Sequence, residues 1–233
     1  MPTRSPTSPA ASDAAAPRRD VFLVGGTGYI GPRLAGELAA RGHRVRALAR
    51  SGSEARLPAG VEIARGDPFD AGSFVAAIPP FATLVQLLGV PHPSPAKAAL
   101  FRSIDLASAK ASGDAAARAG VAHFVYVSVA RPSPVMKAYQ EARAEAEDYL
   151  RSLPFAATFL RPWYVLGPGH RWPYALLPFY WIAERLPGTR ETARRLGLVT
   201  IREMVRALVW AIENPPPHGV RIMEVPDVRT AGR

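Results

Sequence analysis

Asp20-Val21-Phe22-Leu23-Val24 runs directly into Gly25-Gly26-Thr27-Gly28-Tyr29-Ile30-Gly31 near the start of the chain. The four apolar residues 21–24 predict a strand that is buried on both faces. Ile30, Leu34 and Leu38 then follow at helical spacing, which predicts a helix over residues 30–41. A glycine-rich turn between a buried strand and a helix is typical of the first unit of a βαβ series, in which the helix N-terminus binds a pyrophosphate.

The rest of the chain continues to alternate short apolar runs with longer helical patterns. Further strands are predicted at residues 45–49, 61–64, 83–88, 121–127, 156–160 and 220–225. Further helices are predicted at about residues 70–78, 96–119, 135–152, 174–186 and 200–213. Such alternation predicts an α/β fold, a doubly wound and mostly parallel Rossmann-type sheet with helices on both faces.

Changes of composition divide the chain into three parts. Residues 1–19 contain four prolines and no apolar periodicity, so we expect a disordered N-terminal tail. Residues 20–161 form the predicted dinucleotide-binding Rossmann domain. Proline and aromatic residues crowd the segment after Arg161, so residues 162–233 are expected to form a small C-terminal cap, a substrate region packed on the same domain.

The overall composition excludes several classes of protein. Hydrophobic residues make up 48% and charged residues 21% of the 233 residues, which is typical of a globular protein. The absence of cysteine excludes disulfides and thiolate metal sites, and the five histidines lie far apart in sequence, so no metal site is expected. The sequence shows neither a signal peptide nor a membrane-spanning segment, and we therefore expect a cytoplasmic protein.

The net charge is +10, and most of the basic residues are arginines. This balance is compatible with a nucleic acid, a membrane surface or a phosphorylated ligand as partner, and equally with a compositional bias of the genome. Because the basic residues form no long run, we expect no specific nucleic acid partner.

Several residues indicate a dinucleotide and its type. Gly25 and Gly28 let the main chain approach a pyrophosphate. The second strand ends at Arg50 without the Asp or Glu that usually holds the ribose 2′-hydroxyl of NAD, and a guanidinium can clamp a 2′-phosphate, so NADP(H) is predicted in preference to NAD(H). Asp67 either accepts a hydrogen bond from the adenine amino group or caps a turn. Gly89 either brings the backbone close to the cofactor or forms an ordinary turn.

These features resemble the short-chain dehydrogenase/reductase superfamily, in its extended and atypical branch. That branch includes NmrA-like proteins and relatives of the NADPH-binding accessory subunit of respiratory complex I. The resemblance covers about residues 20–225 and rests on residues 25–31, 65–67, 119–128, 160–162, 167–169 and 198–200. It implies a Rossmann fold and an NAD(P) cofactor but no particular substrate. The cofactor contacts that it implies are Gly25, Thr27, Gly28, Tyr29, Ile30, Arg50, Asp67, Pro68, Leu88, Gly89 and Arg143.

The resemblance also implies a catalytic group. Enzymes of the superfamily use a Ser or Thr together with a Tyr-x-x-x-Lys pair on one helix, one turn apart. Tyr139 matches the proton-transferring Tyr, and Arg143 stands where the Lys would hold the nicotinamide ribose. Arginine keeps the charge but differs in shape, so this exchange is not conservative. The hydroxyl position falls near Val129, which leaves Ser128 and, in the next loop, Ser133 as candidates.

Seven aromatic residues lie close together in the expected cap. They predict the wall of an apolar substrate site, a protein or membrane-surface contact, or ordinary core packing. The oligomeric state is left open. The residues are Trp163, Tyr164, Trp172, Tyr174, Phe179, Tyr180 and Trp181.

Two functions of different classes follow from these residues. The first is an NADPH-dependent oxidoreductase that acts on a small apolar carbonyl or quinone-like substrate, with Tyr139 as the acid/base. The second is a catalytically silent NADPH-binding module with a structural or redox-sensing role in a larger complex. NADPH consumption across a panel of aldehydes, ketones and quinones distinguishes the two.

Overall fold

A computed structural model describes residues 17–133, 135–168 and 196–233 of the chain. Its main sheet has seven strands in the order β3-β2-β1-β4-β5-β6-β9, and every neighbouring pair is parallel. The prediction of a doubly wound parallel sheet is therefore confirmed. The strands are β1 (Asp20–Val24), β2 (Arg44–Ala49), β3 (Glu62–Arg65), β4 (Thr83–Gln86), β5 (His123–Val127), β6 (Ala156–Leu160) and β9 (Val220–Met223).

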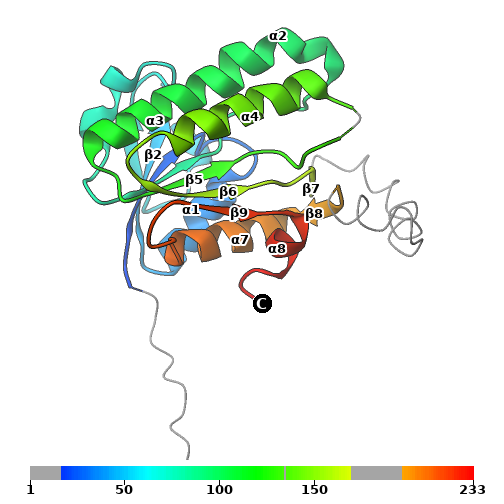
Figure 1. Ribbon diagram of the computed structural model, residues 1–233. Helices are drawn as coiled ribbons and strands as arrows, with labels where there is room; N and C mark the ends of the chain where they lie inside the picture. Colours follow the sequence, from blue (N-terminus) through cyan, green and yellow to red (C-terminus); the bar gives the residue numbers. More distant parts are fainter. Residues whose placement is uncertain (1–16, 134, 169–195) are drawn as a thin grey trace, which may run out of the picture.

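Helices cover both faces of the sheet (Figure 1). Helices α1 (Gly31–Ala40) and α7 (Ile201–Glu213) lie on one face, and α3 (Ala107–Ala119) and α4 (Lys137–Arg151) lie on the other. Successive side chains of a strand point to opposite faces, so β1 contributes to two separate cores. Val21 and Leu23 pack in the core with α1 and α7, whereas Phe22 and Val24 pack in the core on the opposite face.

The helix that crosses from β4 to β5 is irregular in its first half. After a 3₁₀ turn at Pro95–Lys97 it runs through α2 (Ala98–Leu100), a π-helical segment at Phe101–Leu106, and α3. Helix α3 ends at Gly120, whose φ of 68° is left-handed. π-Helical segments are frequent at functional sites, and this one carries the buried Asp105. No helix in the described part of the chain is both long and apolar enough to cross a membrane.

Several local predictions are wrong. Residues 70–78 form two short 3₁₀ turns, Ala71–Ser73 and Val75–Ala77, instead of one helix. Asp70 caps the first turn by accepting a hydrogen bond from the amide of Gly72, and glycine weakens any continuation as a helix. The predicted strand 83–88 ends at Gln86, whose side-chain oxygen accepts a hydrogen bond from the amide of Leu88 in the following turn.

The C-terminal segment contributes to the main sheet and to one of its helix layers. Strand β9 pairs in parallel with β6, with Ala157 opposite Val220. Helix α7 begins after Thr200, which forms a capping box with Glu203. The sequence did not predict the short parallel pair β7 (Tyr164–Leu166) and β8 (Leu198–Thr200), nor helix α8 (Val225–Thr230). The division at residue 161 remains a prediction. Residues 1–16 of the expected tail 1–19, and the expected helix 174–186, lie outside the described residues.

His123 is a buried titratable group at the start of β5, with Nε2 3.0 Å from Thr158 Oγ1. Burial, followed by the nearby charges of Arg19 and Arg221, lowers the pKa of its imidazole from 6.5 to about 3. Below pH 6.5 the unfolded chain therefore binds a proton that the folded protein excludes. The contribution of His123 to stability is complete above pH 6.5 and is lost as the pH falls toward 3.

We therefore expect the free energy of unfolding to fall by about 2 kcal/mol between pH 7 and pH 5 on account of His123 alone. His123→Asn places a neutral polar side chain at the same position, so the variant should lose about 2 kcal/mol less than the wild type over this interval. Urea unfolding at the two pH values measures the difference. Equal losses in the two proteins would show that His123 does not exclude the proton.

Candidate active site

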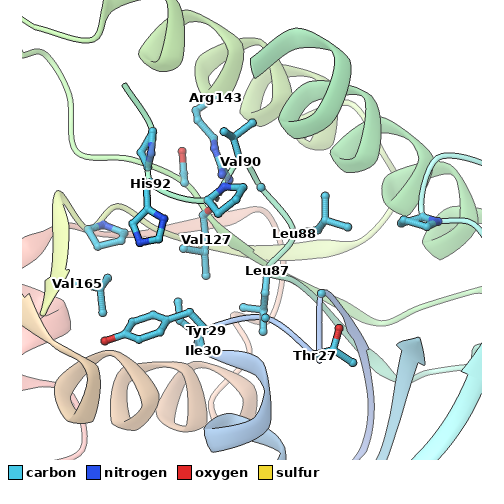
Figure 2. Close-up of a pocket in the computed structure, with 18 of the residues that line it drawn as sticks. Thr27, Tyr29, Ile30, Leu87, Leu88, Val90, His92, Val127, Arg143 and Val165 are labelled. Carbon is cyan, nitrogen blue, oxygen red and sulfur yellow. Dashed lines mark hydrogen bonds between the residues drawn. The ribbon is translucent and has the colours of Figure 1, made fainter. Parts of the chain in front are cut away.

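A cavity of about 490 Å³ lies at the carboxyl ends of the strands, where the strand order reverses between β1 and β4. Doubly wound folds bind their ligands at this point. The turn after β1, the loop after β4, the start of α4 and residues 162–165 supply the walls (Figure 2). All of the predicted cofactor and catalytic residues except Asp67 line it, namely Gly25, Thr27, Gly28, Tyr29, Ile30, Arg50, Pro68, Leu88, Gly89, Ser128, Tyr139 and Arg143.

The glycine turn forms one end of the cavity. Gly25 has a φ of 83°, and a Cβ on it would lie 2.6 Å from the amide nitrogen of Leu88, so both the conformation and the space require glycine. A Cβ on Gly28, in contrast, would approach only the carbonyl oxygen of Gly25, at 3.2 Å. No acidic residue lies in the first turn of α1, so its positive end is available to an anion.

Two arginines, Arg50 and Arg56, lie where the ribose and adenine of a bound dinucleotide are expected. Both are exposed and line the cavity, and neither guanidinium has a hydrogen-bond or ion-pair partner in the described part of the chain. None of the described residues that line the cavity is an Asp or a Glu. The sequence analysis missed Arg56, although it stands only six residues after Arg50.

Asp67 forms a turn of its own. Its Oδ1 accepts a hydrogen bond from the amide of Phe69 at 2.9 Å, and its backbone amide donates one to Ser73 Oγ. Its neighbours Gly66 and Pro68 line the cavity. The hydrogen bond from the amide of Phe69 supports the alternative in which Asp67 caps a turn. Adenine recognition by this side chain remains a prediction.

Tyr139 and Arg143 lie together on the first turns of α4, as their spacing predicts. The guanidinium of Arg143 lies over the Tyr139 ring, with Cζ 5.2 Å from the ring centroid. Burial raises the pKa of the Tyr139 hydroxyl, the charge of Asp105 adds to this effect, and Arg143 opposes it. The hydroxyl is therefore protonated at neutral pH and can donate a proton.

Arg143 is buried and paired with Asp105, a residue that the sequence analysis missed. Its Nη2 lies 2.5 Å from Asp105 Oδ1, and its Nη1 donates to the carbonyl oxygen of Val127 at 2.6 Å. Its Nε has no hydrogen-bond partner among the described residues. A buried donor without a partner is rare, so this N–H is suited to a ligand that enters the cavity.

Gly89 lies directly against this ion pair. A Cβ on Gly89 would lie 2.3 Å from Arg143 Nη2 and 2.8 Å from Asp105 Oδ1. The other Asp105 oxygen accepts a hydrogen bond from the amide of Val90 at 3.1 Å. Asp105 thus links the loop after β4 to α4, and only glycine leaves room for the pair.

The hydroxyl of Ser128 donates a hydrogen bond to Glu147, with Oγ 2.6 Å from Oε1. Glu147 is completely buried and also accepts hydrogen bonds from Arg131 and Arg161. Burial opposes the negative charge, but the hydrogen bonds from Arg161 and Ser128 and the charges of Arg161 and Arg131 lower the pKa of its carboxyl. The sequence analysis missed Glu147, because no local pattern distinguishes it from a solvated residue of the helix.

Ser133 and the aromatic cluster are the remaining candidates. Ser133 is buried, its amide donates to the Gln140 side chain, and it is not among the described lining residues. Of the aromatic cluster, Trp163 and Tyr164 line the cavity and contact each other edge to face, with ring centroids 5.6 Å apart. The remaining five aromatic residues, Trp172, Tyr174, Phe179, Tyr180 and Trp181, lie outside the described part of the chain.

Comparison with known proteins agrees with this geometry. The model of a family described as NAD(P)H-binding matches residues 25–171, from the glycine turn past the start of the cap. The chain belongs to this family. The match supports an NAD(P) cofactor for this chain without distinguishing NADPH from NADH.

Three known proteins are similar to this chain. A ceramide reductase of Caulobacter vibrioides is 25% identical over 219 residues, which cover 91% of this chain and 66% of that protein. The Bordetella bronchiseptica enzyme WbmG, solved with NAD and UDP, has a TM-score of 0.65 at 16% identity and covers 91% of this chain and 75% of its own. A short-chain dehydrogenase/reductase of Agrobacterium tumefaciens with bound NAD has a TM-score of 0.63 at 18% identity, covering 88% and 77%. The chain spans just under two thirds of the reductase, and the two structures support the fold alone.

Proposed function

We propose that the protein is an NADPH-dependent oxidoreductase that reduces the carbonyl or quinone group of a small apolar substrate. The observation that carries the proposal is a single cavity that extends from two unpartnered arginines, past the glycine turn, to a protonated tyrosine. Because none of its described lining residues is acidic, the cavity suits an anionic dinucleotide that carries an additional phosphate.

The residues present fit such a cofactor. The backbone amides of the glycine turn and the start of α1 would hold the pyrophosphate, and Arg50 with Arg56 would hold the 2′-phosphate. The unpartnered Nε–H of Arg143 would donate to the nicotinamide ribose. When bound, the reduced nicotinamide supplies a hydride to the substrate carbon, and Tyr139 donates the proton that the substrate oxygen takes up.

The substrate end of the cavity is lined mostly by apolar side chains. Val90, Pro91, Pro93, Val127 and Val165 are among them, with Trp163 and Tyr164 beside them. Apolar walls with a few polar groups are typical of sites for hydrophobic ligands. The similarity to a ceramide reductase supports a lipid-like carbonyl compound as the substrate.

The direct test follows NADPH oxidation by the purified protein with aldehydes, ketones and quinones of increasing chain length. We expect turnover that rises with the length of the apolar chain. A protein that binds NADPH but oxidises it with none of these compounds would contradict the proposal.

The second candidate is a silent NADPH-binding module, and two observations favour it. The hydroxyl of Ser128 donates its hydrogen bond to Glu147, and two nitrogens of Arg143 donate to Asp105 and to the carbonyl oxygen of Val127. They favour a silent module because a hydroxyl and two guanidinium nitrogens that are engaged within the protein do not contact a substrate. Tight NADPH binding without turnover is the result that this candidate predicts.

Arg50→Glu is expected to weaken NADPH binding by about 10- to 150-fold and to change NADH binding much less. The physical reason is the loss of one or more charge-assisted hydrogen bonds to the 2′-phosphate, about 1.5–3 kcal/mol, with added charge repulsion. Calorimetric titration of both cofactors measures the two affinities.

Arg118→Glu is the matched control, because it makes the same change of charge at an exposed position of α3 outside the cavity. It should leave both affinities as in the wild type. If Arg50→Glu weakens both cofactors equally, Arg50 does not select NADPH. In that case Arg56 is the next residue to substitute.

A further inference from the structure

Asp105 carries a buried negative charge in the π-helical segment between α2 and α3. Its side chain is completely buried, and it is not among the described residues that line the cavity. Its two carboxylate oxygens have different partners, since Oδ1 accepts from Arg143 Nη2 at 2.5 Å and Oδ2 accepts from the amide of Val90 at 3.1 Å. A carboxylate held in this way does not contact a substrate, so any part it has in the reaction acts through Arg143.

The guanidinium of Arg143 is fixed by further contacts and lies close to the proton donor of the site. Its Nη1 donates to the carbonyl oxygen of Val127 at 2.6 Å and to the hydroxyl of Tyr126 at 3.3 Å. Both of these acceptors are neutral, so Asp105 is the one carboxylate that pairs with this guanidinium in the described part of the chain. The guanidinium lies over the ring of Tyr139, with Cζ 5.2 Å from the ring centroid.

The titratable groups around the Tyr139 hydroxyl come from several elements. Arg143 lies on the same helix, Asp105 on the π-helical segment and Tyr126 on β5, and His92 of the loop after β4 lines the same cavity. Burial raises the pKa of the Tyr139 hydroxyl, the charge of Arg143 lowers it, and the charge of Asp105 raises it. Among the described residues that act on this pKa, Asp105 is the only acid. Without Asp105, the guanidinium would stabilise the phenolate form of the tyrosine.

We propose that Asp105 is a positioning residue that sets the direction of the reaction: by pairing with the guanidinium over the ring of Tyr139, it keeps the tyrosine a proton donor and makes the site reductive. The inference rests on the proposed function, because it assumes that Tyr139 exchanges a proton with a carbonyl compound. Reduction moves the hydroxyl proton to the substrate oxygen, whereas oxidation of an alcohol needs the phenolate to accept a proton. The charge of Asp105 therefore favours one direction over the other.

Asp105→Asn tests this role, because it removes the charge and keeps the shape of the side chain. We expect the midpoint of Tyr139 ionisation to fall by about 1–3 pH units, which is the effect of an uncompensated opposite charge beside a titratable group. NMR of the protein labelled with ¹³C at the tyrosine Cζ follows this ionisation. The Tyr139 resonance is the one that Tyr139→Phe lacks, and the measurement needs neither substrate nor turnover.

Two further variants separate the effect of charge from a loss of stability. A buried guanidinium without its carboxylate is strongly destabilising, and Asp105→Ser removes the same charge while leaving room for water beside it. This variant replaces Asp105→Asn if the latter does not fold. Glu213→Gln is the matched control, because it breaks a largely buried ion pair with Arg41 and His43 outside the described cavity lining. It should leave the midpoint of Tyr139 as in the wild type.

The pH profile of turnover is the second readout. In Asp105→Asn, the alkaline increase in the oxidation of 2-octanol by NADP⁺ should move to lower pH by the same interval as the NMR midpoint. Reduction of 2-octanone by NADPH should lose activity over that same range, because the proton donor is then ionised. A purely structural role of Asp105 would lower both rates without moving either profile.

Each outcome decides the inference. A Tyr139 midpoint that is the same in the wild type and in the folded neutral variants of Asp105 would overturn it, as would an equal shift in Glu213→Gln. If the midpoint shifts as expected but the wild type oxidises NADPH with no compound of the panel, the proposed function fails while the control of Tyr139 by Asp105 stands. If the wild type reduces carbonyl compounds and the midpoint does not move, the inference alone fails.

Discussion

Tyr139→Phe is expected to lower kcat for carbonyl reduction by about 10²–10⁴-fold, because that is the usual contribution of a positioned general acid. The substitution keeps the ring, which packs against Phe101 with centroids 4.9 Å apart and lies under the guanidinium of Arg143. Only the hydroxyl is removed, so the dissociation constant of NADPH should barely change. Steady-state kinetics and calorimetry on the two proteins measure both quantities.

The same α4 helix offers a matched control. Tyr149→Phe removes a hydroxyl that donates to Asp114, and Tyr149 is not among the described residues that line the cavity. Its kcat should equal that of the wild type. A wild type and a Tyr139→Phe variant that both bind NADPH and are equally inert across the carbonyl and quinone panel would instead identify a silent binding module.

The electrostatics around Tyr139 favour the reductive direction. Burial raises the pKa of its hydroxyl above the ordinary value of 10, and Asp105 adds to this while Arg143 opposes it. The group thus stays protonated through neutral pH, as a general acid must. We infer that kcat for reduction is independent of pH around neutrality. Oxidation of an alcohol needs the ionised form and should increase into the alkaline range.

The central strands and both cores were predictable because they depend on local patterns. Residues 20–31 combine an apolar run, a glycine turn and helical spacing, and the structure has β1, the turn and α1 in that order. The strand pair β7–β8 was missed because it depends on a long-range contact. Strands β7 and β8 have three residues each and pair across more than thirty positions, a distance at which no local pattern indicates a partner.

In the candidate site, too, residues within a local pattern were predictable and residues that depend on long-range contacts were not. The residues of the glycine turn, Arg50 and the Tyr139–Arg143 pair could be named as candidates because local patterns indicate them, and they line one cavity. Asp105 and Glu147 were missed, because their roles arise from burial against Arg143 and Arg161, which come from other elements. A charged residue in a helix is usually solvated, and only the folded structure distinguishes a buried ion pair from that default.

The structure also gives a physical reason for an arginine at position 143, where the pattern of the resembled superfamily has a lysine. A lysine would offer a compact ammonium in place of the planar guanidinium that lies over the ring of Tyr139. The guanidinium also donates to Asp105 and to the carbonyl oxygen of Val127 from two different nitrogens, and Gly89 provides the space for it. The departure from the superfamily pattern is therefore accompanied by Asp105 and Gly89, two residues that fit it.

Gly28→Val is expected to weaken NADPH binding by about 10²–10⁴-fold while the protein remains folded. A side chain here would enter the space of the pyrophosphate and remove charge-assisted hydrogen bonds of about 1.5–3 kcal/mol each, of which two are enough for this effect. The turn should need only a small adjustment, because a single atom, the carbonyl oxygen of Gly25 at 3.2 Å, lies close to the new Cβ and has to move by a few tenths of an ångström. Calorimetric titration with NADPH and thermal unfolding measure the two expectations separately.

Gly36→Val provides the control, since it introduces the same side chain into α1 outside the cavity, with the new Cβ 3.8 Å from Pro58. Its affinity for NADPH should match the wild type. Gly25 does not provide a test of this kind, because its φ of 83° and the nearby Leu88 amide mean that any side chain distorts the fold itself. An unchanged NADPH affinity in folded Gly28→Val would exclude the glycine turn from the binding site. The cofactor would then have to reach Tyr139 without contacting the start of α1.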